Sequence, residues 1–330
     1  MKYRKLGRSG PEVSEIALGS WLTFAGGIQK EQARATLEAA FDAGITLFDT
    51  ANMYGRGAAE QAWGEMLSQH SRESYVLATK VWGPMSETDS GLSAPQIAKQ
   101  IDGSLRRLRT DYVDLYQAHR FDTSVPIEET IEALLLVVRQ GKARYLGFSE
   151  WTPEQIRAAV DIAGPDVFVS SQPQYSMLWR APEAEVFDVC TAAGIHQIVW
   201  SPMAQGLLTG KYLPGKPLPA DSRFAHQEMN AFQDIVWSDQ ALEAVQRLVP
   251  VAEQAGLSMP QLALAWALRR DELAAVIIGA SRPEQVHSNA AAAGVHLSDE
   301  TLQQIESALG DVPVTGPRLA MYAEEGVLHR

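Results

Sequence analysis

The chain has 330 residues, of which 46% are hydrophobic and 21% charged, as is ordinary for a globular protein. Its formal net charge of -12 argues against a general affinity for nucleic acid or for an anionic membrane surface, and we expect neither partner. The single cysteine, Cys190, excludes an internal disulfide bond. The N-terminus lacks the apolar run of a signal peptide, and no stretch approaches the roughly 20 apolar residues of a membrane span. The expected location is the cytoplasm.

Short β-rich runs alternate with amphipathic helical patterns along the whole chain. In chain order, the expected strands are 15–20, 45–50, 75–80, 113–119, 143–149, 167–172, 197–201 and 274–280. Helical patterns lie between them, for example at 30–44, 94–108, 127–142 and 153–164. This alternation predicts parallel βαβ units.

Two α/β architectures are compatible with such units: an open, doubly wound sheet and a closed (β/α)8 TIM barrel. The count of eight strands and the chain length favour the barrel, as a single domain over 1–330. The segment 3–13 is expected to form an N-terminal β-hairpin that closes the bottom of the barrel. We further expect extra helices, and a long loop rich in glycine and proline after strand 7, at 202–239.

Each expected strand is apolar upstream and ends near a small or polar residue. These residues are Ser20, Asp49, Lys80, His119, Ser149, Gln172, Ser201 and Gly279. In a barrel of this type the carboxyl ends of the strands meet at one mouth, where active sites lie. Because Asp49, Lys80 and His119 are each separated by about one βα unit, the barrel brings their side chains together.

A reaction follows from the chemistry of these side chains. A carboxylate at the end of a buried strand is costly unless it is paired, and Lys80 is the expected partner of Asp49. Tyr54 lies on the loop just beyond Asp49, where the lysine ammonium is expected to lower the pKa of the phenol from about 10. Such a tyrosine can protonate a developing alkoxide, while His119 orients the carbonyl oxygen. The cluster therefore predicts carbonyl reduction, with the hydride coming from a separate cofactor.

The chain also resembles the aldo-keto reductase superfamily along nearly its whole length, most of all the subgroup of bacterial reductases and voltage-gated potassium channel β-subunits. The resemblance is carried by motifs that occur in order at spacings compatible with the barrel. They are FDTANMYG (48–55) with GAAE (57–60), LATKVWG (77–83), SLRRLRTDYVDLYQAHR (104–120), GKARYLGFSEW (141–151), WSPMAQGLLTGKY (200–212) and IIGASRPEQVHSN (277–289).

The resemblance implies a catalytic tetrad of Asp49, Tyr54, Lys80 and His119, and NADPH bound in an extended form across the barrel mouth. On the nicotinamide and ribose side it implies Ser20, Trp21, Ser149, Gln172, Trp200, Ser201 and Pro202. Met203, Gly206 and Lys211 would continue along the pyrophosphate. At the adenosine end it implies Arg223, Gly279, Ser281, Gln285 and Asn289, with Arg223 at the 2′-phosphate and a helix start after Ala280 and Ser281 offering N–H groups.

The substrate implied is a small carbonyl compound. Several tryptophans follow or end strands, and Trp21, Trp82 and Trp151 are the expected lining of an apolar substrate pocket. The loop 202–239 is expected to cover the cofactor, and the tail 311–330 to border the pocket. Related proteins occur as monomers, tetramers and octamers, so a homo-oligomer is open.

Three positions depart from known patterns. Many family members have a lysine where this chain has Ala280, so a preference for NADPH over NADH rests on Arg223, with Arg282 as a second candidate. The channel-subunit branch has arginine in place of Glu150 and asparagine in place of His119. The histidine completes the reductase tetrad and favours an enzyme.

Other readings of the sequence remain as alternatives. One is a regulatory or redox-sensing subunit that binds NADPH and turns over slowly. Another is a barrel in which Lys80 forms a Schiff base, as in class I aldolases. The run GRGAAE (55–60) imitates a dinucleotide fingerprint but lacks its third glycine. No cysteine and histidine spacing indicates a metal site.

Overall fold

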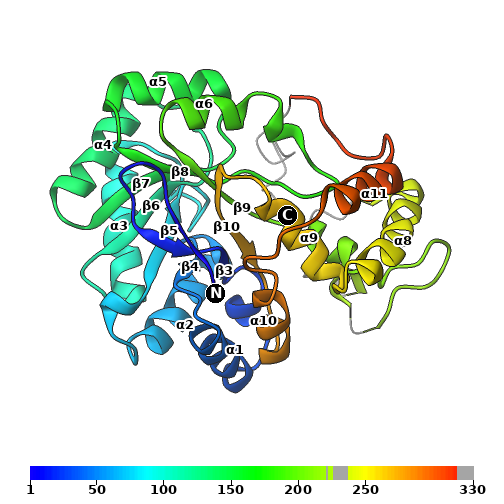
Figure 1. Ribbon diagram of the computed structural model, residues 1–330. Helices are drawn as coiled ribbons and strands as arrows, with labels where there is room; N and C mark the ends of the chain where they lie inside the picture. Colours follow the sequence, from blue (N-terminus) through cyan, green and yellow to red (C-terminus); the bar gives the residue numbers. More distant parts are fainter. Residues whose placement is uncertain (221, 226–236, 318–330) are drawn as a thin grey trace.

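The protein is a closed barrel of eight parallel strands surrounded by helices (Figure 1). It is seen in a computed structural model that describes residues 1–220, 222–225 and 237–317. The barrel strands, in the order β10-β3-β4-β5-β6-β7-β8-β9, run parallel to their neighbours. Their bounds are β3 Ile16–Gly19, β4 Leu47–Asp49, β5 Val76–Val81, β6 Val113–Ala118, β7 Ala143–Phe148, β8 Phe168–Ser171, β9 His196–Val199 and β10 Leu273–Ile278. The predicted TIM barrel is confirmed, and the open sheet is excluded.

The N-terminal hairpin closes the end of the barrel opposite to the carboxyl ends of its strands. Strands β1 (Tyr3–Lys5) and β2 (Glu12–Ser14) pair antiparallel, and the hairpin lies in front of the barrel in Figure 1. Leu6 and Val13 are fully buried against the inward-facing residues of the barrel. Arg4 donates to the main-chain oxygens of Leu268 and Leu273 at 2.7 and 2.9 Å, beside the start of β10. These contacts confirm the predicted bottom closure.

The barrel helices follow the predicted patterns, with ends set by local signals. Thr152 and Gln155 form a capping box at the start of the helix after β7, and Gly164 ends that helix at φ 83°. In the described part of the chain the α-helices are α1 Lys30–Asp42, α2 Ala58–Leu67, α3 Ala94–Leu108, α4 Ile127–Arg139, α5 Pro153–Ala163, α6 Val186–Ala192, α8 Asp239–Gln254, α9 Met259–Leu268, α10 Pro283–Ala290 and α11 Asp299–Leu309. Two helices, α8 and α9, lie between β9 and β10, and α11 follows α10. The predicted extra helices are therefore present.

Gly57 and Glu60 of GRGAAE serve the packing of α2 on α3. Glu60 is fully buried and accepts from Arg107 Nε at 2.7 Å and from Thr79 Oγ1 at 2.6 Å. Gly57 has φ 93°, and a Cβ at that position would lie 2.6 Å from Cδ of Arg107. The motif therefore admits an arginine close to the backbone and pairs it with a carboxylate, which is a structural role.

The loop after β9 and the C-terminal segment lie on the same side of the molecule. The loop contains a short helix at Ala204–Thr209 and a turn at Arg223–Ala225, while 221 and 226–236 fall outside the described residues. After α11, Val314 accepts from the N–H of Arg180 at 2.7 Å and donates to the oxygen of Leu178 at 2.9 Å. The tail is predicted over 311–330, and the structure describes it up to residue 317. This part crosses the segment that follows β8.

Candidate active site

Strand alternation places the polar side chains of the site inside the barrel. Leu47 and Ala78 pack in the barrel interior, and residues two positions further on in the same strands share that face. Asp49 and Lys80 are those residues, and Lys80 pairs in register with Gln117 of β6. A layer of polar groups therefore lies directly above the apolar floor of the barrel, at the carboxyl ends of the strands.

Lys80 is the centre of this layer, and its side chain is fully buried. Its Nζ atom lies 2.5 Å from Oδ1 of Asp49, 2.9 Å from the main-chain oxygen of Thr50 and 3.4 Å from the hydroxyl of Tyr54. Burial by itself would lower the pKa of Lys80, but the charge of Asp49 and the contact with Tyr54 outweigh it and raise the pKa. The lysine is therefore a fixed cation that joins the carboxylate to the phenol.

Tyr54 lies on the short helical turn Tyr54–Gly57 that follows β4. Burial of its hydroxyl raises its pKa above the usual value, and the charge of Lys80 reverses this effect only in part. The expectation that the lysine lowers this pKa below the ordinary value is therefore wrong, because desolvation is the larger effect. The phenol is protonated at neutral pH, which is the state that a proton donor needs.

His119 follows β6 and lies beside Tyr54. Their ring centroids are 5.6 Å apart and nearly perpendicular, and His119 is 7% exposed. Burial, together with the charges of Arg120 and Lys80, holds the pKa of His119 well below its usual range, so the imidazole is neutral at pH 7. Its Nδ1 atom is buried and has no hydrogen-bond partner among the described residues.

Two glutamines extend the network from Asp49 to the neighbouring strands. Gln172 Nε2 donates to Oδ2 of Asp49 at 2.9 Å, and Gln117 Nε2 approaches the same oxygen at 3.4 Å. The hydroxyl of Ser149 donates to the main-chain oxygen of Gln172 at 2.6 Å. On the other side of the mouth, Ser20 Oγ donates to Oγ1 of Thr50 at 2.7 Å. Ser20, Ser149 and Gln172 of the predicted cofactor set are thus assembled around Asp49.

The backbone after β9 is irregular at the residues predicted to follow the cofactor. Ser201, Ala204 and Gln205 have φ values of 53°, 45° and 58°, and Gly206 has φ 102°. Left-handed conformations in non-glycine residues are strained and gather at functional sites. Mixed left- and right-handed backbone can also form concave arrays of N–H groups that bind anions. Pro202 is buried, Met203 is partly buried, and Lys211 is exposed with its Nζ 5.2 Å from the ring centroid of Tyr212.

Glu150 holds Trp200 across two strands. Its Oε1 atom accepts from Nε1 of Trp200 at 2.9 Å and from the N–H of Gln174 at 2.5 Å. Glu150 is 5% exposed and has φ 56°, another left-handed conformation directly after a barrel strand. The carboxylate that departs from the channel-subunit pattern therefore orients a tryptophan predicted to contact the cofactor.

Arg223 lies on the loop after β9 and reaches the part of the mouth formed by β3, two strands away in the barrel. Its guanidinium is 5.1 Å from the ring centroid of Trp21, which follows β3, and its Nη2 is 3.3 Å from Oε1 of Gln205. Trp21 in turn lies 6.4 Å from the ring of Tyr54. Because β3 and β9 flank β10, the loop after β9 passes over the end of β10. The described part of 202–239 thus lies over one side of the barrel mouth.

The residues predicted for the adenosine end lie between β10 and α10. Gln285 Oε1 accepts from the N–H of Ser281 at 2.8 Å and lies 3.2 Å from its hydroxyl. The main-chain oxygen of Ser281 accepts from Gln32 of α1 at 2.6 Å. Asn289 is 5% exposed, and a Cβ added at Gly279 would have nothing within 4 Å, so the space above the end of β10 is open.

The three tryptophans predicted to line the substrate pocket do not lie together. Trp21 and Trp82 are partly exposed at the mouth, and Trp82 has the unusual φ of 151°. Trp151 is 1% exposed and stacks on Phe148 at 5.0 Å, with Phe121 at 5.2 Å edge-on. Its indole is part of the core between barrel and helices, so the structure gives it no open surface for a substrate.

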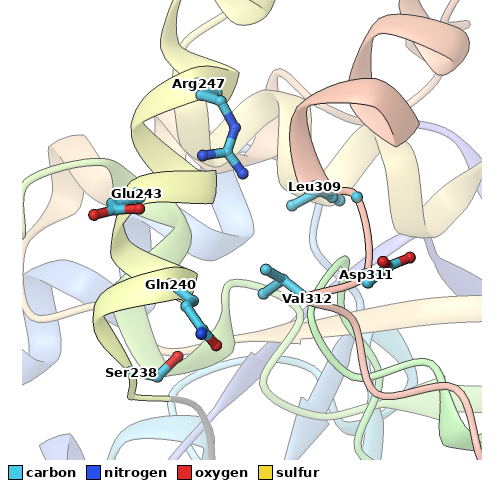
Figure 2. A pocket seen from close by; sticks show the side chains of 8 residues that line it. Ser238, Gln240, Glu243, Arg247, Leu309, Asp311 and Val312 are labelled. Atoms are coloured by element: carbon cyan, nitrogen blue, oxygen red, sulfur yellow. The ribbon is translucent and has the colours of Figure 1, made fainter.

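A surface hollow between α8 and the segment after α11 contains none of the predicted site residues. Figure 2 shows Arg247 of α8 pointing into it, with Leu309 and Val312 on the opposite wall. Arg247 donates from Nε to the main-chain oxygen of Ala308 at 2.8 Å, at the end of α11. The hollow lies on the outer helices and is not lined by the buried polar residues of the barrel mouth. The mouth is therefore the candidate active site.

Three site residues were missed by sequence reasoning: Gln117, Arg120 and Glu150 as a partner of Trp200. Gln117 could have been found, because it lies two positions before His119 and so on the same face of β6. Arg120 and Glu150 follow strand ends in irregular backbone, and no periodicity shows where their side chains point.

Over residues 1–220, 222–225 and 237–317, no three histidine, cysteine or carboxylate side chains lie close enough together to hold a metal ion. Within the same part of the chain, no helix combines the length and the apolar character needed to cross a membrane.

Comparison with known proteins gives one family and consistent relatives. The model of the Aldo/keto reductase family matches residues 15–309. A protein of Oryza sativa subsp. japonica named "Probable voltage-gated potassium channel subunit beta" is 38% identical over 325 residues, which cover 95% of this chain and 98% of that protein. A protein of Arabidopsis thaliana with the same name is 37% identical over 325 residues, with the same coverage. The likeness therefore extends over the whole barrel.

Proposed function

The chain belongs to the aldo/keto reductase family, a family of oxidoreductases that act on carbonyl groups, and from this premise we propose that it reduces aldehydes or ketones to alcohols with NADPH. The observation that carries the proposal is the position of Lys80, whose Nζ contacts both Asp49 and Tyr54. No serine or cysteine nucleophile is needed for this chemistry. A buried cation beside a protonated phenol is an arrangement for giving a proton to an oxygen that gains negative charge.

In the proposed reaction Tyr54 is the general acid. Its hydroxyl hydrogen moves to the carbonyl oxygen of the substrate as that oxygen becomes an alkoxide, and a phenolate remains on the enzyme. Lys80 stabilises this phenolate because its ammonium lies 3.4 Å from the phenol oxygen, and Asp49 keeps the ammonium charged and oriented. His119 is neutral, so it can donate one hydrogen bond to the carbonyl oxygen without competing as an acid.

The residues around the mouth fit an extended dinucleotide. The positive side chains of Arg223 and Lys211 lie on the loop after β9, and the left-handed backbone at 201–206 suits an anion such as a pyrophosphate. Ser149 and Gln172 would hold the nicotinamide end, and Ser281, Gln285 and Asn289 the adenosine end. When bound, NADPH supplies the hydride that the carbonyl carbon receives. Trp21 and Trp82 are the proposed apolar walls of the substrate pocket.

The test is nicotinamide oxidation followed by absorbance, with an aromatic aldehyde and with NADPH or NADH in parallel. We expect turnover with NADPH, and a loss of roughly 10²–10⁴-fold in kcat for Tyr54→Phe at unchanged cofactor affinity. Tyr112→Phe is the matched control, since Tyr112 lies outside the mouth, between Arg72 and Arg144. Equal rates for wild type and Tyr54→Phe would contradict the proposed role of Tyr54.

Cofactor preference is tested at Arg223. If its guanidinium contacts the 2′-phosphate, Arg223→Ala weakens NADPH binding by about 1.5–3 kcal/mol and leaves NADH binding nearly unchanged. Equal weakening of both cofactors would contradict a contact with the 2′-phosphate, and would mean that Arg223 acts on a part that both cofactors share or through Trp21 and Gln205, which it contacts.

A second candidate function is supported by the names of the relatives, both of which are called channel β-subunits. A regulatory protein of this kind would retain NADPH after purification and turn over slowly. Cofactor bound at one equivalent together with very slow oxidation by every aldehyde tried would favour it. The presence of His119 and the protonated state of Tyr54 support the reductase instead.

The Schiff-base alternative is not favoured by the site. A nucleophilic lysine needs a lowered pKa, whereas Asp49 and Tyr54 raise that of Lys80. Borohydride trapping of a carbonyl substrate on wild type but not on Lys80→Met would reverse this assignment.

A further inference from the structure

Arg120 follows His119 at the barrel mouth, and the proposed reaction does not yet use it. The main-chain ladder of the barrel continues past the strand ends here: the N–H of His119 donates to the oxygen of Val81 at 2.9 Å, and that of Ser149 to the oxygen of Ala118, also at 2.9 Å. The next carbonyl along the chain belongs to His119. This carbonyl oxygen accepts from Nη1 of Arg120 at 2.5 Å. The guanidinium therefore supplies a donor at the point where the main-chain hydrogen bonds between the strands end.

The same nitrogen of Arg120 reaches the neighbouring strand. Nη1 lies 3.0 Å from Oγ of Ser149, whose hydroxyl donates to the main-chain oxygen of Gln172. Gln172 Nε2 donates to Asp49, which pairs with Lys80, and Lys80 contacts Tyr54. A continuous series of hydrogen bonds therefore runs around the mouth from Arg120 to the proposed proton donor.

Arg120 also adds a permanent positive charge to the site. The charged and titratable groups that act on Tyr54 and His119 are Lys80 at the end of β5, Asp49 at the end of β4 and Arg120 after β6. The charge of Arg120 lowers the pKa of Tyr54 and that of His119, since it favours the phenolate and disfavours the imidazolium. Unlike lysine, arginine holds its charge at every pH of interest, and its N–H donors are fixed in one rigid plane.

We propose that Arg120 is a positioning residue for the proposed reduction, which ties the main chain of His119 to the hydroxyl of Ser149 and supplies a second fixed cation beside Lys80. The inference rests on the proposed function of Tyr54 and His119. Two effects of Arg120 can be separated. It fixes the geometry of its contacts with His119 and Ser149, and its charge acts on the titration of Tyr54 and of His119.

The test compares Arg120→Gln, Arg120→Lys and Ser149→Ala in the full-length protein. Arg120→Gln removes the charge. Arg120→Lys keeps the charge but lacks the rigid planar guanidinium, and Ser149→Ala removes one acceptor while the charge stays. Arg157→Gln is the matched control, because it removes one arginine charge from the surface pair of Arg157 with Glu154 on α5. Three readouts are the pH profile of kcat with NADPH, the titration of the Tyr54 phenolate by ultraviolet absorbance against Tyr54→Phe, and the titration of His119 by NMR.

For Arg120→Gln we expect kcat to fall roughly 10- to 100-fold, because the oriented side chains are displaced. Both titrations should move to higher pH, since removal of a cation disfavours the phenolate and favours the imidazolium. Arg120→Lys should return both titrations toward wild type and recover part of the rate. Ser149→Ala should lower the rate without moving either titration, and Arg157→Gln should change nothing.

A fall in kcat for Arg120→Gln with both titrations unmoved would overturn the electrostatic part and leave Arg120 a structural residue. Unchanged kcat and unchanged titrations would overturn the proposal entirely. If wild type does not turn over, the proposed function fails, whereas the phenolate and imidazole titrations still decide the inference. Should Arg120→Gln not fold, the titrations of Arg120→Lys against Ser149→Ala separate charge from geometry in the same way.

Discussion

Lys80 and Asp49 form an ion pair inside the barrel, with 2.5 Å between Nζ and Oδ1 and only 0% and 4% of their side-chain surfaces exposed. Removing one partner of such a pair leaves a buried charge uncompensated. We therefore expect Asp49→Asn to lower the free energy of unfolding by about 3–5 kcal/mol, as measured by urea denaturation. The exposed surface pair of Arg157 and Glu154 is the comparison: Glu154→Gln should leave the free energy of unfolding nearly unchanged.

The double variant Asp49→Asn with Lys80→Met separates stability from activity. It removes both charges, so it should be more stable than Asp49→Asn alone. It should nevertheless be inactive, because the phenolate of Tyr54 has lost its cation. A double variant less stable than Asp49→Asn would show that Lys80 is held mainly by its contact with Thr50.

The pH dependence of reduction follows from the state of Tyr54. Its pKa is raised by burial, so the proton donor stays protonated through neutral and mildly alkaline pH. We expect kcat in the reduction direction to show no loss of the acid until pH passes the ordinary tyrosine value of about 10. An alkaline decline in kcat centred near pH 8 that disappears in Tyr54→Phe would contradict this prediction, because it would show that the pKa of Tyr54 lies below its ordinary value.

The stability of the protein should depend on His119 at acid pH. The folded protein holds this imidazole neutral, whereas the unfolded chain binds a proton near pH 6.5. Below that pH the unfolded state binds more protons, so stability falls as pH falls, by about 1.4 kcal/mol per pH unit for this one group. His119→Asn should lose less stability between pH 6.5 and 5 than wild type does. Parallel curves of unfolding free energy against pH for His119→Asn and wild type would mean that the folded protein protonates His119 as readily as the unfolded chain does.

Glu150 is expected to matter through Trp200. Glu150→Ala leaves the indole N–H of Trp200 and the N–H of Gln174 without their carboxylate acceptor, which should cost about 1–3 kcal/mol in unfolding free energy. NADPH should also bind more weakly by titration calorimetry, because Trp200 is no longer oriented. Glu150→Gln retains an acceptor oxygen and should show the smaller effect in both measurements; equal effects would point to the charge rather than the hydrogen bonds.

The strands and the central cluster were predictable because they depend on local patterns. All eight strands lie within two residues of the predicted ends, since each is a short apolar run bounded by turn residues. The meeting of Asp49 with Lys80 follows from alternation within strands and from the parallel direction of their neighbours. Tyr54 lies within reach because only a few residues separate it from β4.

Trp151 shows where the same reasoning stops. It follows β7, just as Trp82 follows β5, and the two are equivalent in the sequence. In the structure Trp151 turns into the core against Phe148 and Phe121, while Trp82 remains partly exposed at the mouth. Which way a side chain turns after a strand depends on the partners that other helices bring, and these are far away in the chain.

The sequence by itself determined the barrel, its hairpin, the reaction class and the four residues proposed to carry it, because strand period, spacing and chemistry are all properties of short segments. Only the tertiary structure decided that burial outweighs Lys80 in setting the pKa of Tyr54, and that Arg120 and Glu150 reach the site. Desolvation depends on everything packed around a group, and long side chains in irregular backbone follow no period. Both are therefore decided by contacts between strands that lie far apart in the chain.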